Sequence, residues 1–267
     1  MVTSLPLLTG RTILITGAAG HLGAAITRGV LLAGGEVIAV GRSAGSLERM
    51  RANLEPNLED RCHLMWADVA EPKSLADLAG EVEKRFGALH GLVNNAYSGR
   101  TGPINALTAS DFGDSCALNL TGPFLLTRHL ADMLKRAGEA IEGGASIVNI
   151  ASMYGKVSPD PSLYGSSAAN NPAHYGATKA GLLQLTRYLA CSLAPGLVRV
   201  NSVSPGPFPN RAGSLPEEFL EGLCRRVPMG RVGVASELAG PIVFLLSAAA
   251  SYVNGADIAV DGGWTAW

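Results

Sequence analysis

Short apolar segments alternate with longer, helix-length segments along this chain, and that alternation constrains the fold more than any other feature. The apolar segments are rich in Val and Ile and lack a polar face, which is typical of strands covered on both sides. Strands and helices in alternation predict an α/β fold, with a doubly wound parallel sheet between helices on both faces. The strands are expected in RTILITG, EVIAVG, CHLMWADV, ALHGLVNNA, ASIVNIAS, LVRVNSVSPG and ADIAVDGG, and the helices at about residues 21–33, 45–54, 72–86, 111–137, 175–194 and 235–248.

The composition is that of one packed domain. Hydrophobic residues make up 47% of the 267, and no repeat or change in composition divides the chain, so residues 1–267 are predicted to form a single domain. With 21 basic and 22 acidic residues, the net charge is −1. Neither nucleic acid nor an anionic membrane surface is therefore expected as a partner.

Cysteine usage and the lack of targeting features predict a cytoplasmic protein. Four cysteines are scattered without a CxxC pair, so no metal site and no disulfide framework is expected. The first residues lack the pattern of a signal peptide. The longest uncharged segment, LAGPIVFLLSAAASYVNGA, is interrupted by Pro241 and Asn254, and we expect a buried helix there rather than a membrane span.

Three glycines, Gly17, Gly20 and Gly23, lie where the first strand passes into the first helix, in ILITGAAGHLG. Glycines at such a turn let the backbone approach a pyrophosphate and let the helix lie close to the sheet. The free N–H groups of the helix N-terminus would then face the phosphates. This turn predicts a Rossmann fold that binds a dinucleotide, with His21 and Leu22 beside the cofactor. The alternative for His21 is a half-exposed helix residue that touches no phosphate.

The end of the second strand, EVIAVGRS, bears on which nicotinamide cofactor is bound. An acidic residue there would bond the ribose hydroxyls of NAD(H). The chain instead has Gly41 followed by Arg42, whose guanidinium suits the 2′-phosphate of NADP(H). NADP(H) is therefore favoured over NAD(H), with Arg42 and Ser43 in contact with it. The alternative is that Arg42 is a solvated loop residue.

Of six tyrosines, only Tyr175 has a lysine four residues later, at Lys179 in YGATKAG. On a helix this spacing places both side chains on one face. A tyrosine with its ordinary pKa of about 10 is a poor acid–base at neutral pH, and a nearby ammonium would lower that pKa. The pair therefore predicts an acid–base centre.

With these motifs in order, the chain resembles the short-chain dehydrogenase/reductase family, in its shorter branch, from about Leu8 to Trp264. The resemblance is carried by TGAAGHLG, ADV at Asp68, NNA at 94–96, NLTG at Asn119, NIAS ending at Ser152, YGATK, VNSVSPG and VDGGW. It implies an NADP(H)-dependent alcohol dehydrogenase or carbonyl reductase, acting on a small molecule. The family also implies a homo-oligomer, a tetramer or dimer, built on helices 111–137 and 175–194.

The resemblance implies a role for each matching residue. Tyr175 would give or take the hydroxyl proton, Ser152 would bond the substrate oxygen, Lys179 would bind the nicotinamide ribose and lower the pKa of Tyr175, and Asn119 would hold a water in a proton relay. The contacts implied along the cofactor are Asp68 and Val69 at the adenine, Asn95 and Ala96 in the wall, and Pro205, Gly206 and Phe208 at the nicotinamide.

Three positions depart from the family pattern. His21 stands where the shorter branch usually has a glycine, Tyr97 follows NNA where glycine is usual, and Asn210 replaces a common threonine. The glycine spacing is similar to that of the longer branch, so an epimerase or dehydratase acting on a sugar derivative with tightly held NAD(P) is the alternative function. A nucleotide-binding sensor without activity is a third class, but it would not need the four catalytic residues together.

The segment between Ser152 and Tyr175 is longer than the family usually places there. Pro159, Pro161 and Pro172 exclude a long regular helix, so a loop is predicted. Because both ends are catalytic residues, the loop is expected to form a polar wall of the substrate pocket and to favour a sugar- or polyol-like substrate. The alternative is a surface loop that touches no substrate.

Overall fold

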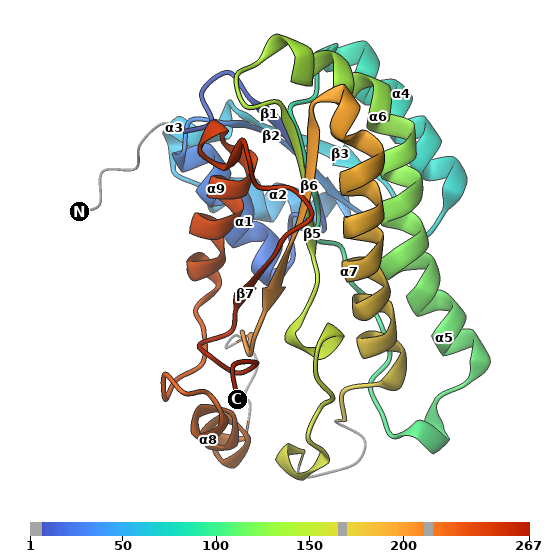
Figure 1. Ribbon diagram of the computed structural model, residues 1–267, viewed down its shortest axis with the longest axis vertical. Helices are drawn as coiled ribbons and strands as arrows, with labels where there is room; N and C mark the ends of the chain where they lie inside the picture. The colour runs from blue at the N-terminus through green and yellow to red at the C-terminus, as the bar shows by residue number, and fades with distance from the viewer. Residues whose placement is uncertain (1–6, 165–169, 211–215) are drawn as a thin grey trace.

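The sheet that the alternation predicts is present in the computed structural model, which describes residues 7–164, 170–210 and 216–267 (Figure 1). Seven parallel strands lie in the order β3-β2-β1-β4-β5-β6-β7, so the chain builds one half of the sheet outward from β1 and then crosses to build the other half. All seven expected strands are confirmed: β1 Thr12–Thr16, β2 Glu36–Gly41, β3 Cys62–Trp66, β4 Gly91–Asn94, β5 Ala145–Ile150, β6 Val198–Pro205 and β7 Asp257–Val260.

Helices cover both faces of this sheet, as the doubly wound fold requires (Figure 1). One core forms where α1, α2 and α9 meet one face of the sheet, and a second where α4, α6 and α7 meet the other. The helices are α1 His21–Leu32, α2 Ala44–Ala52, α3 Pro56–Glu59, α4 Pro72–Phe86, α5 Ala109–Cys116, α6 Gly122–Ala140, α7 Ala173–Leu193, α8 Glu217–Arg226 and α9 Ala239–Leu246.

The expected helix at 111–137 is interrupted. A π-helical turn, Ala117–Thr121, separates α5 from α6. Gly122 follows it, and a Cβ there would lie 2.5 Å from the carbonyl oxygen of Val69, so the helix passes the chain after β3 at very close range. The turn carries Asn119, and π-helical turns are frequent at functional sites.

Two short helices, α3 and α8, were not expected from the sequence. They have four and ten residues, too few for a clear apolar period to be read without neighbours. Among the described residues no helix is both long and apolar enough to cross a membrane.

The arrangement of the strands determines where a site can form. Because the strands are parallel, the segments that follow β1, β4, β5 and β6 all emerge at one edge of the sheet. In doubly wound sheets ligands bind at this carboxyl edge, where the strand order reverses. Here the reversal lies between β1 and β4.

Candidate active site

The turn between β1 and α1 requires glycine at two positions, one because of its backbone conformation and one because a side chain would collide with the backbone. Gly17 has φ +64°, which favours glycine. A Cβ on Gly23 would lie 2.0 Å from the carbonyl oxygen of Gly17. Gly20 precedes the helix and caps it with no side chain, so the first N–H groups of α1 remain available to an anion.

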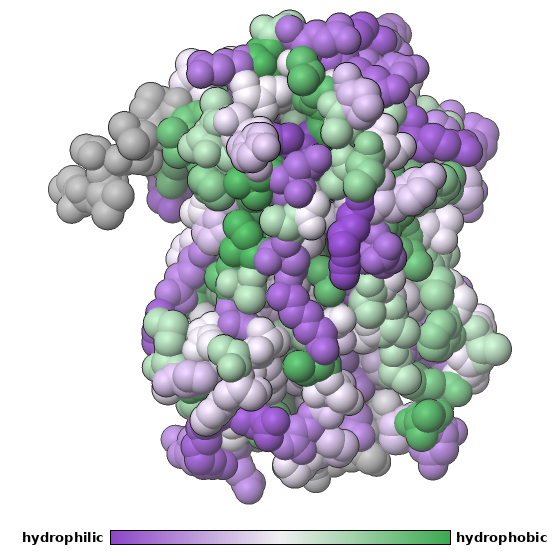
Figure 2. Space-filling model, viewed as in Figure 1, coloured by the Kyte–Doolittle hydropathy of each residue, from purple (hydrophilic) through white to green (hydrophobic). Residues whose placement is uncertain are grey.

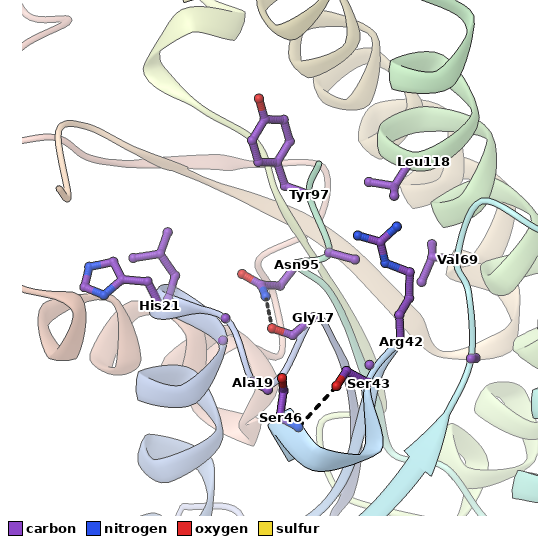
Figure 3. Close-up of a pocket in the computed structure, with 16 residues that line it drawn as sticks. Gly17, Ala19, His21, Arg42, Ser43, Ser46, Val69, Asn95, Tyr97 and Leu118 are labelled. Atoms are coloured by element: carbon purple, nitrogen blue, oxygen red, sulfur yellow. Dashed lines mark hydrogen bonds between the residues drawn. The ribbon is translucent and has the colours of Figure 1, made fainter. Parts of the chain in front are cut away.

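A cavity of about 490 Å³ opens over this turn (Figure 3). Ten of the residues expected at the cofactor line it: Gly17, Gly20, His21, Leu22, Gly23, Arg42, Ser43, Val69, Asn95 and Ala96. Ala19, Ser46, Ala67 and Leu118 also line it and were not expected from the sequence, because small or apolar residues at those positions carry no motif of their own. The glycine turn and the open helix N-terminus fit the pyrophosphate of a nicotinamide dinucleotide.

Asn95 fixes the wall opposite the turn. Its Nδ2 donates to the carbonyl oxygens of Thr16 and Gly17 at 2.9 and 3.1 Å. The Thr16 hydroxyl in turn accepts from the backbone N–H groups of Asn95 and Ala96. These bonds tie the segment after β4 to the segment after β1, so the backbone at Tyr97 is held in place.

Arg42 lies at the far end of the cavity, on an exposed turn between β2 and α2, with its guanidinium on the side of Val69 and Leu118 (Figure 3). Trp66 fixes the backbone there, because its indole N–H donates to the Arg42 carbonyl at 2.6 Å. Ser43 caps α2 by accepting from the backbone N–H of Ser46. The turn is thus ordered while the guanidinium stays accessible from the cavity.

The remaining expected contacts lie outside the lining of this cavity. Asp68 accepts from the backbone N–H of Ala70 at 3.0 Å and so shapes the turn after β3. Pro205 ends β6, and the N–H of Gly206 bonds the Val260 carbonyl. Phe208 lines a separate cavity of about 470 Å³ between the segments after β6 and β7. These four residues were expected at the adenine and nicotinamide ends of the cofactor, and the lining of the cavity over the glycine turn does not include them.

The buried Ser152 and the half-buried Tyr175 meet at the carboxyl end of β5. Ser152 is 4% exposed, and its oxygen accepts the backbone N–H of Tyr154 at 3.1 Å, so its own proton is free to be donated. The Ser152 side chain also hydrogen-bonds Tyr175. Burial raises the pKa of Tyr175, and the hydrogen bond with Ser152 opposes that rise.

This direction differs from the expectation that Lys179 lowers the pKa of Tyr175. Lys179 is 4% exposed, and its Nζ donates to the Ile150 carbonyl at 2.6 Å rather than to the tyrosine oxygen. Burial lowers the pKa of Lys179 to about 8. For both residues, the cost of removing the charged form from water thus outweighs the attraction between the Lys179 ammonium and the Tyr175 phenolate.

Asn119 has the geometry of a water-binding residue. Its Nδ2 donates to the Ser115 hydroxyl at 2.9 Å, and its Oδ1 is buried with no hydrogen-bond partner among the described residues. A buried acceptor without a partner is costly unless a water satisfies it.

The sequence did not single out a second pair of tyrosines at this site. The hydroxyls of Tyr154 and Tyr164 lie 3.2 Å apart. Tyr164 contributes to the raised pKa of Tyr175, and Tyr175 contributes to the raised pKa of Tyr154. Tyr164 belongs to the long loop, of which residues 165–169 lie outside the described part of the chain. The loop therefore comes close to Tyr175 at Leu163 and Tyr164.

The same loop is attached to α8. Asp160 pairs with Arg226 at 2.7 Å, and the ring of Tyr164 lies 5.6 Å from that of Phe219. Leu163 and Tyr175 both contact the buried cluster that includes Leu223 of α8. The other side of the loop borders a cavity of about 600 Å³ whose lining includes neither Ser152 nor Tyr175.

Comparison with known proteins gives matches over nearly the whole chain. The family model described as enoyl-(acyl carrier protein) reductase matches residues 17–265. An uncharacterised short-chain type dehydrogenase/reductase of Sinorhizobium fredii is 36% identical over 266 residues, but these cover 96% of this chain and only 44% of that longer protein. D-threitol dehydrogenase of Mycolicibacterium smegmatis is 35% identical, over 97% of this chain and 94% of that one.

Among solved structures, a gluconate 5-dehydrogenase from Burkholderia cenocepacia, in complex with NADP and tartrate, superposes with a TM-score of 0.84. It is 30% identical, and the match covers 100% of both chains.

Proposed function

The chain belongs to the short-chain dehydrogenase/reductase family and is an NAD(P)-dependent oxidoreductase. From that premise we propose that it interconverts a secondary alcohol and a ketone on a polar, polyol- or sugar-like substrate. NADP(H) is the preferred cofactor. Residues 1–267 act as one domain that holds both the cofactor and the catalytic residues. The observation that carries this proposal is the contact of Ser152 with the half-buried Tyr175, one helical turn from Lys179. Tyr97, whose ring lies against Tyr175, lines the glycine-turn cavity.

The catalytic residues divide the work on the substrate oxygen. When a substrate is bound, the Ser152 hydroxyl donates a hydrogen bond to that oxygen and orients it. Tyr175 takes the alcohol proton in oxidation, or gives it back in reduction. The nicotinamide, when bound, accepts or supplies the hydride.

Two further residues support the proton transfer. Lys179 uses its remaining N–H groups to bind the nicotinamide ribose, and its charge stabilises the phenolate that forms on Tyr175 during oxidation. Asn119 binds a water through its unpartnered Oδ1, and that water carries protons away from the site.

NADP(H) is favoured by Arg42 and by the lack of an acid at Gly41. The guanidinium is accessible from the cavity, where it can bond a 2′-phosphate. A carboxylate at the end of β2 would repel that phosphate, and none stands there. Asp68, Pro205, Gly206 and Phe208 complete the binding site at the adenine and nicotinamide ends.

A polar substrate is favoured by the hydroxyls near the catalytic group. Tyr154 and Tyr164 offer two hydroxyls within one hydrogen-bonded pair, next to Tyr175. Two relatives named for D-threitol and gluconate, both polyhydroxylated, support the same class, whereas two others are named for cis-4-hydroxycyclohexanecarboxylate and a 7alpha-hydroxysteroid.

We further propose a cytoplasmic homotetramer. Phe112, Phe124 and Tyr188 of α5, α6 and α7 are exposed by 39–66%. In Figure 2 apolar residues also gather at the lower right edge, over α5 and the segment before it. Exposed apolar side chains on these helices would be buried in an interface with another copy of the chain.

A substrate screen tests the proposal. The purified protein is mixed with polyols, sugar acids, steroids and simple ketones, with NADP(H) and NAD(H) in turn, and absorbance at the nicotinamide band is followed. Catalytic turnover with the polyhydroxylated compounds and NADP(H) is expected. Turnover that is fastest with steroids or NAD(H) would contradict the substrate or cofactor assignment. Conversion of a substrate with no net oxidation or reduction of the added cofactor would indicate an epimerase or dehydratase.

Shortening the loop tests its part in the choice of substrate. Replacement of residues 158–170 by a brief Gly/Ser linker is expected to lower kcat/KM for polyhydroxylated substrates more than for simple ketones. A folded variant with an unchanged substrate profile would show that the loop does not select the substrate.

A further inference from the structure

The ring of Tyr97 contacts both members of the catalytic pair. Its centroid lies 4.9 Å from that of Tyr175, with the two planes at 73°, an edge-to-face arrangement. The Nζ of Lys179 lies 5.9 Å from the Tyr97 centroid and 5.8 Å from the Tyr175 centroid. The ammonium is therefore within contact range of two aromatic faces.

This placement is set by the backbone. Tyr97 follows Asn95 and Ala96, which Thr16 holds at the carboxyl edge of the sheet. In Figure 3 its side chain points away from Arg42 and the glycine turn. On the hydroxyl side it meets Gly99, where a Cβ would lie 3.1 Å from the tyrosine oxygen.

We propose that Tyr97 is a positioning residue of the catalytic centre: its ring holds Tyr175 edge to face and provides an aromatic face that keeps the buried Lys179 protonated. The proposal rests on the proposed function for its effect on turnover, but not for its effect on Lys179.

The surroundings of Lys179 explain why an aromatic face matters there. The Nζ makes one hydrogen bond within the described residues, to the neutral Ile150 carbonyl. The titratable groups that face it are Tyr97, from the segment after β4, and Tyr175 from its own helix. Tyr154 and Tyr164 lie beyond Tyr175. No carboxylate of the described residues pairs with the ammonium.

Burial works against the charge on Lys179, and no acid compensates. The negative face of an aromatic ring is what remains to stabilise a desolvated cation. Burial raises the pKa of Tyr97 itself to about 12, so this ring acts as a neutral phenol and contributes no charge.

Two substitutions separate the aromatic face from the volume of the side chain. Tyr97→Phe keeps the ring and removes the hydroxyl. Tyr97→Leu fills much of the same space but has no aromatic face. Tyr97 as a whole residue is 45% exposed, although its ring lies against Tyr175 and Lys179, so both variants are expected to fold. Tyr97→Met replaces Tyr97→Leu if the latter lowers the midpoint of thermal unfolding.

The chain has five lysines, Lys73, Lys84, Lys135, Lys156 and Lys179, so each can be followed in lysine labelled with 13C at Cε. Titration by NMR is expected to give the same pKa for Lys179 in the wild type and in Tyr97→Phe. In Tyr97→Leu it is expected to fall by on the order of one unit. The other four lysines are internal controls and should not move.

The same variants are then assayed for turnover. The alkaline limb of kcat/KM is expected at lower pH in Tyr97→Leu and unchanged in Tyr97→Phe. An unchanged Lys179 titration in Tyr97→Leu would overturn the inference whatever the activity. If Lys179 titrates as expected but no alcohol or ketone is turned over, the proposed function fails and the role of Tyr97 stands.

Discussion

Substitution of Gly23 by alanine tests whether the glycine turn is fixed by close contact between backbone segments. The new Cβ would lie 2.0 Å from the Gly17 carbonyl oxygen and 2.9 Å from the Asn95 Nδ2. Because the oxygen belongs to the backbone, no change of rotamer can relieve the contact, and α1 must move away from the turn.

The expected magnitude follows from two opposing effects. Alanine stabilises a helix by about 1 kcal/mol relative to glycine. Overfilling a close-packed site costs about 1–3 kcal/mol, and a backbone contact belongs at the upper end. The free energy of unfolding should therefore fall by about 2 kcal/mol. Since the turn itself must open, the Kd for NADPH should rise at least about tenfold, or ~1.4 kcal/mol.

Gly80→Ala is the matched control. Gly80 lies in α4, is exposed, and a Cβ there would meet nothing within 4 Å. This variant should gain about 0.5–1 kcal/mol of stability from helix propensity alone. Urea unfolding with linear extrapolation and titration with NADPH measure both quantities. If Gly23→Ala matches Gly80→Ala in stability and binds NADPH like the wild type, the close contact does not restrict the turn.

Three further outcomes are expected. Tyr175→Phe should lower kcat by about 10²–10⁴-fold with the Kd for NADPH unchanged, because only the acid–base oxygen is lost; a rate near that of the wild type at saturating substrate would refute the assignment. Arg42→Ala should weaken NADPH binding about tenfold with little effect on NADH, and the difference should shrink with added salt; equal Kd values for both cofactors in the wild type would rule out this role. Burial lowers the pKa of Lys179 to about 8. Between about pH 8 and 10 the unfolded chain therefore binds more protons than the folded one. The free energy of unfolding should rise with pH over this range, by at most ~1.4 kcal/mol per pH unit. Lys179→Met should remove that slope, and a slope that persists in Lys179→Met must have another origin.

The fold was predictable from the sequence because strand and helix patterns repeat with little ambiguity. Every strand lies where an apolar segment predicts it, and the glycine turn lies at the carboxyl end of β1. The π-helical turn at Ala117–Thr121 was not predictable, because it depends on how closely Gly122 passes Val69.

The candidate site was predictable where its residues belong to local motifs. Tyr175 and Lys179 share one helix, and the glycines share one turn. The contact of Tyr164 with Tyr154 and the ring of Tyr97 beside Lys179 are tertiary, so no spacing in the sequence reveals them. The raised pKa of Tyr175 likewise depends on burial, which the motif does not express.

The attachment of the long loop to α8 has a consequence for how this protein and its relatives diverge. Asp160 and Arg226 are 66 positions apart in sequence but form one ion pair, and Tyr164 lies against Phe219. A substitution in the loop therefore changes the surroundings of α8, and only a matching substitution there restores the contact. Among proteins that keep this loop, we expect the two segments to have co-evolved. A change in substrate preference would then require substitutions in both the loop and α8, not in one of them alone.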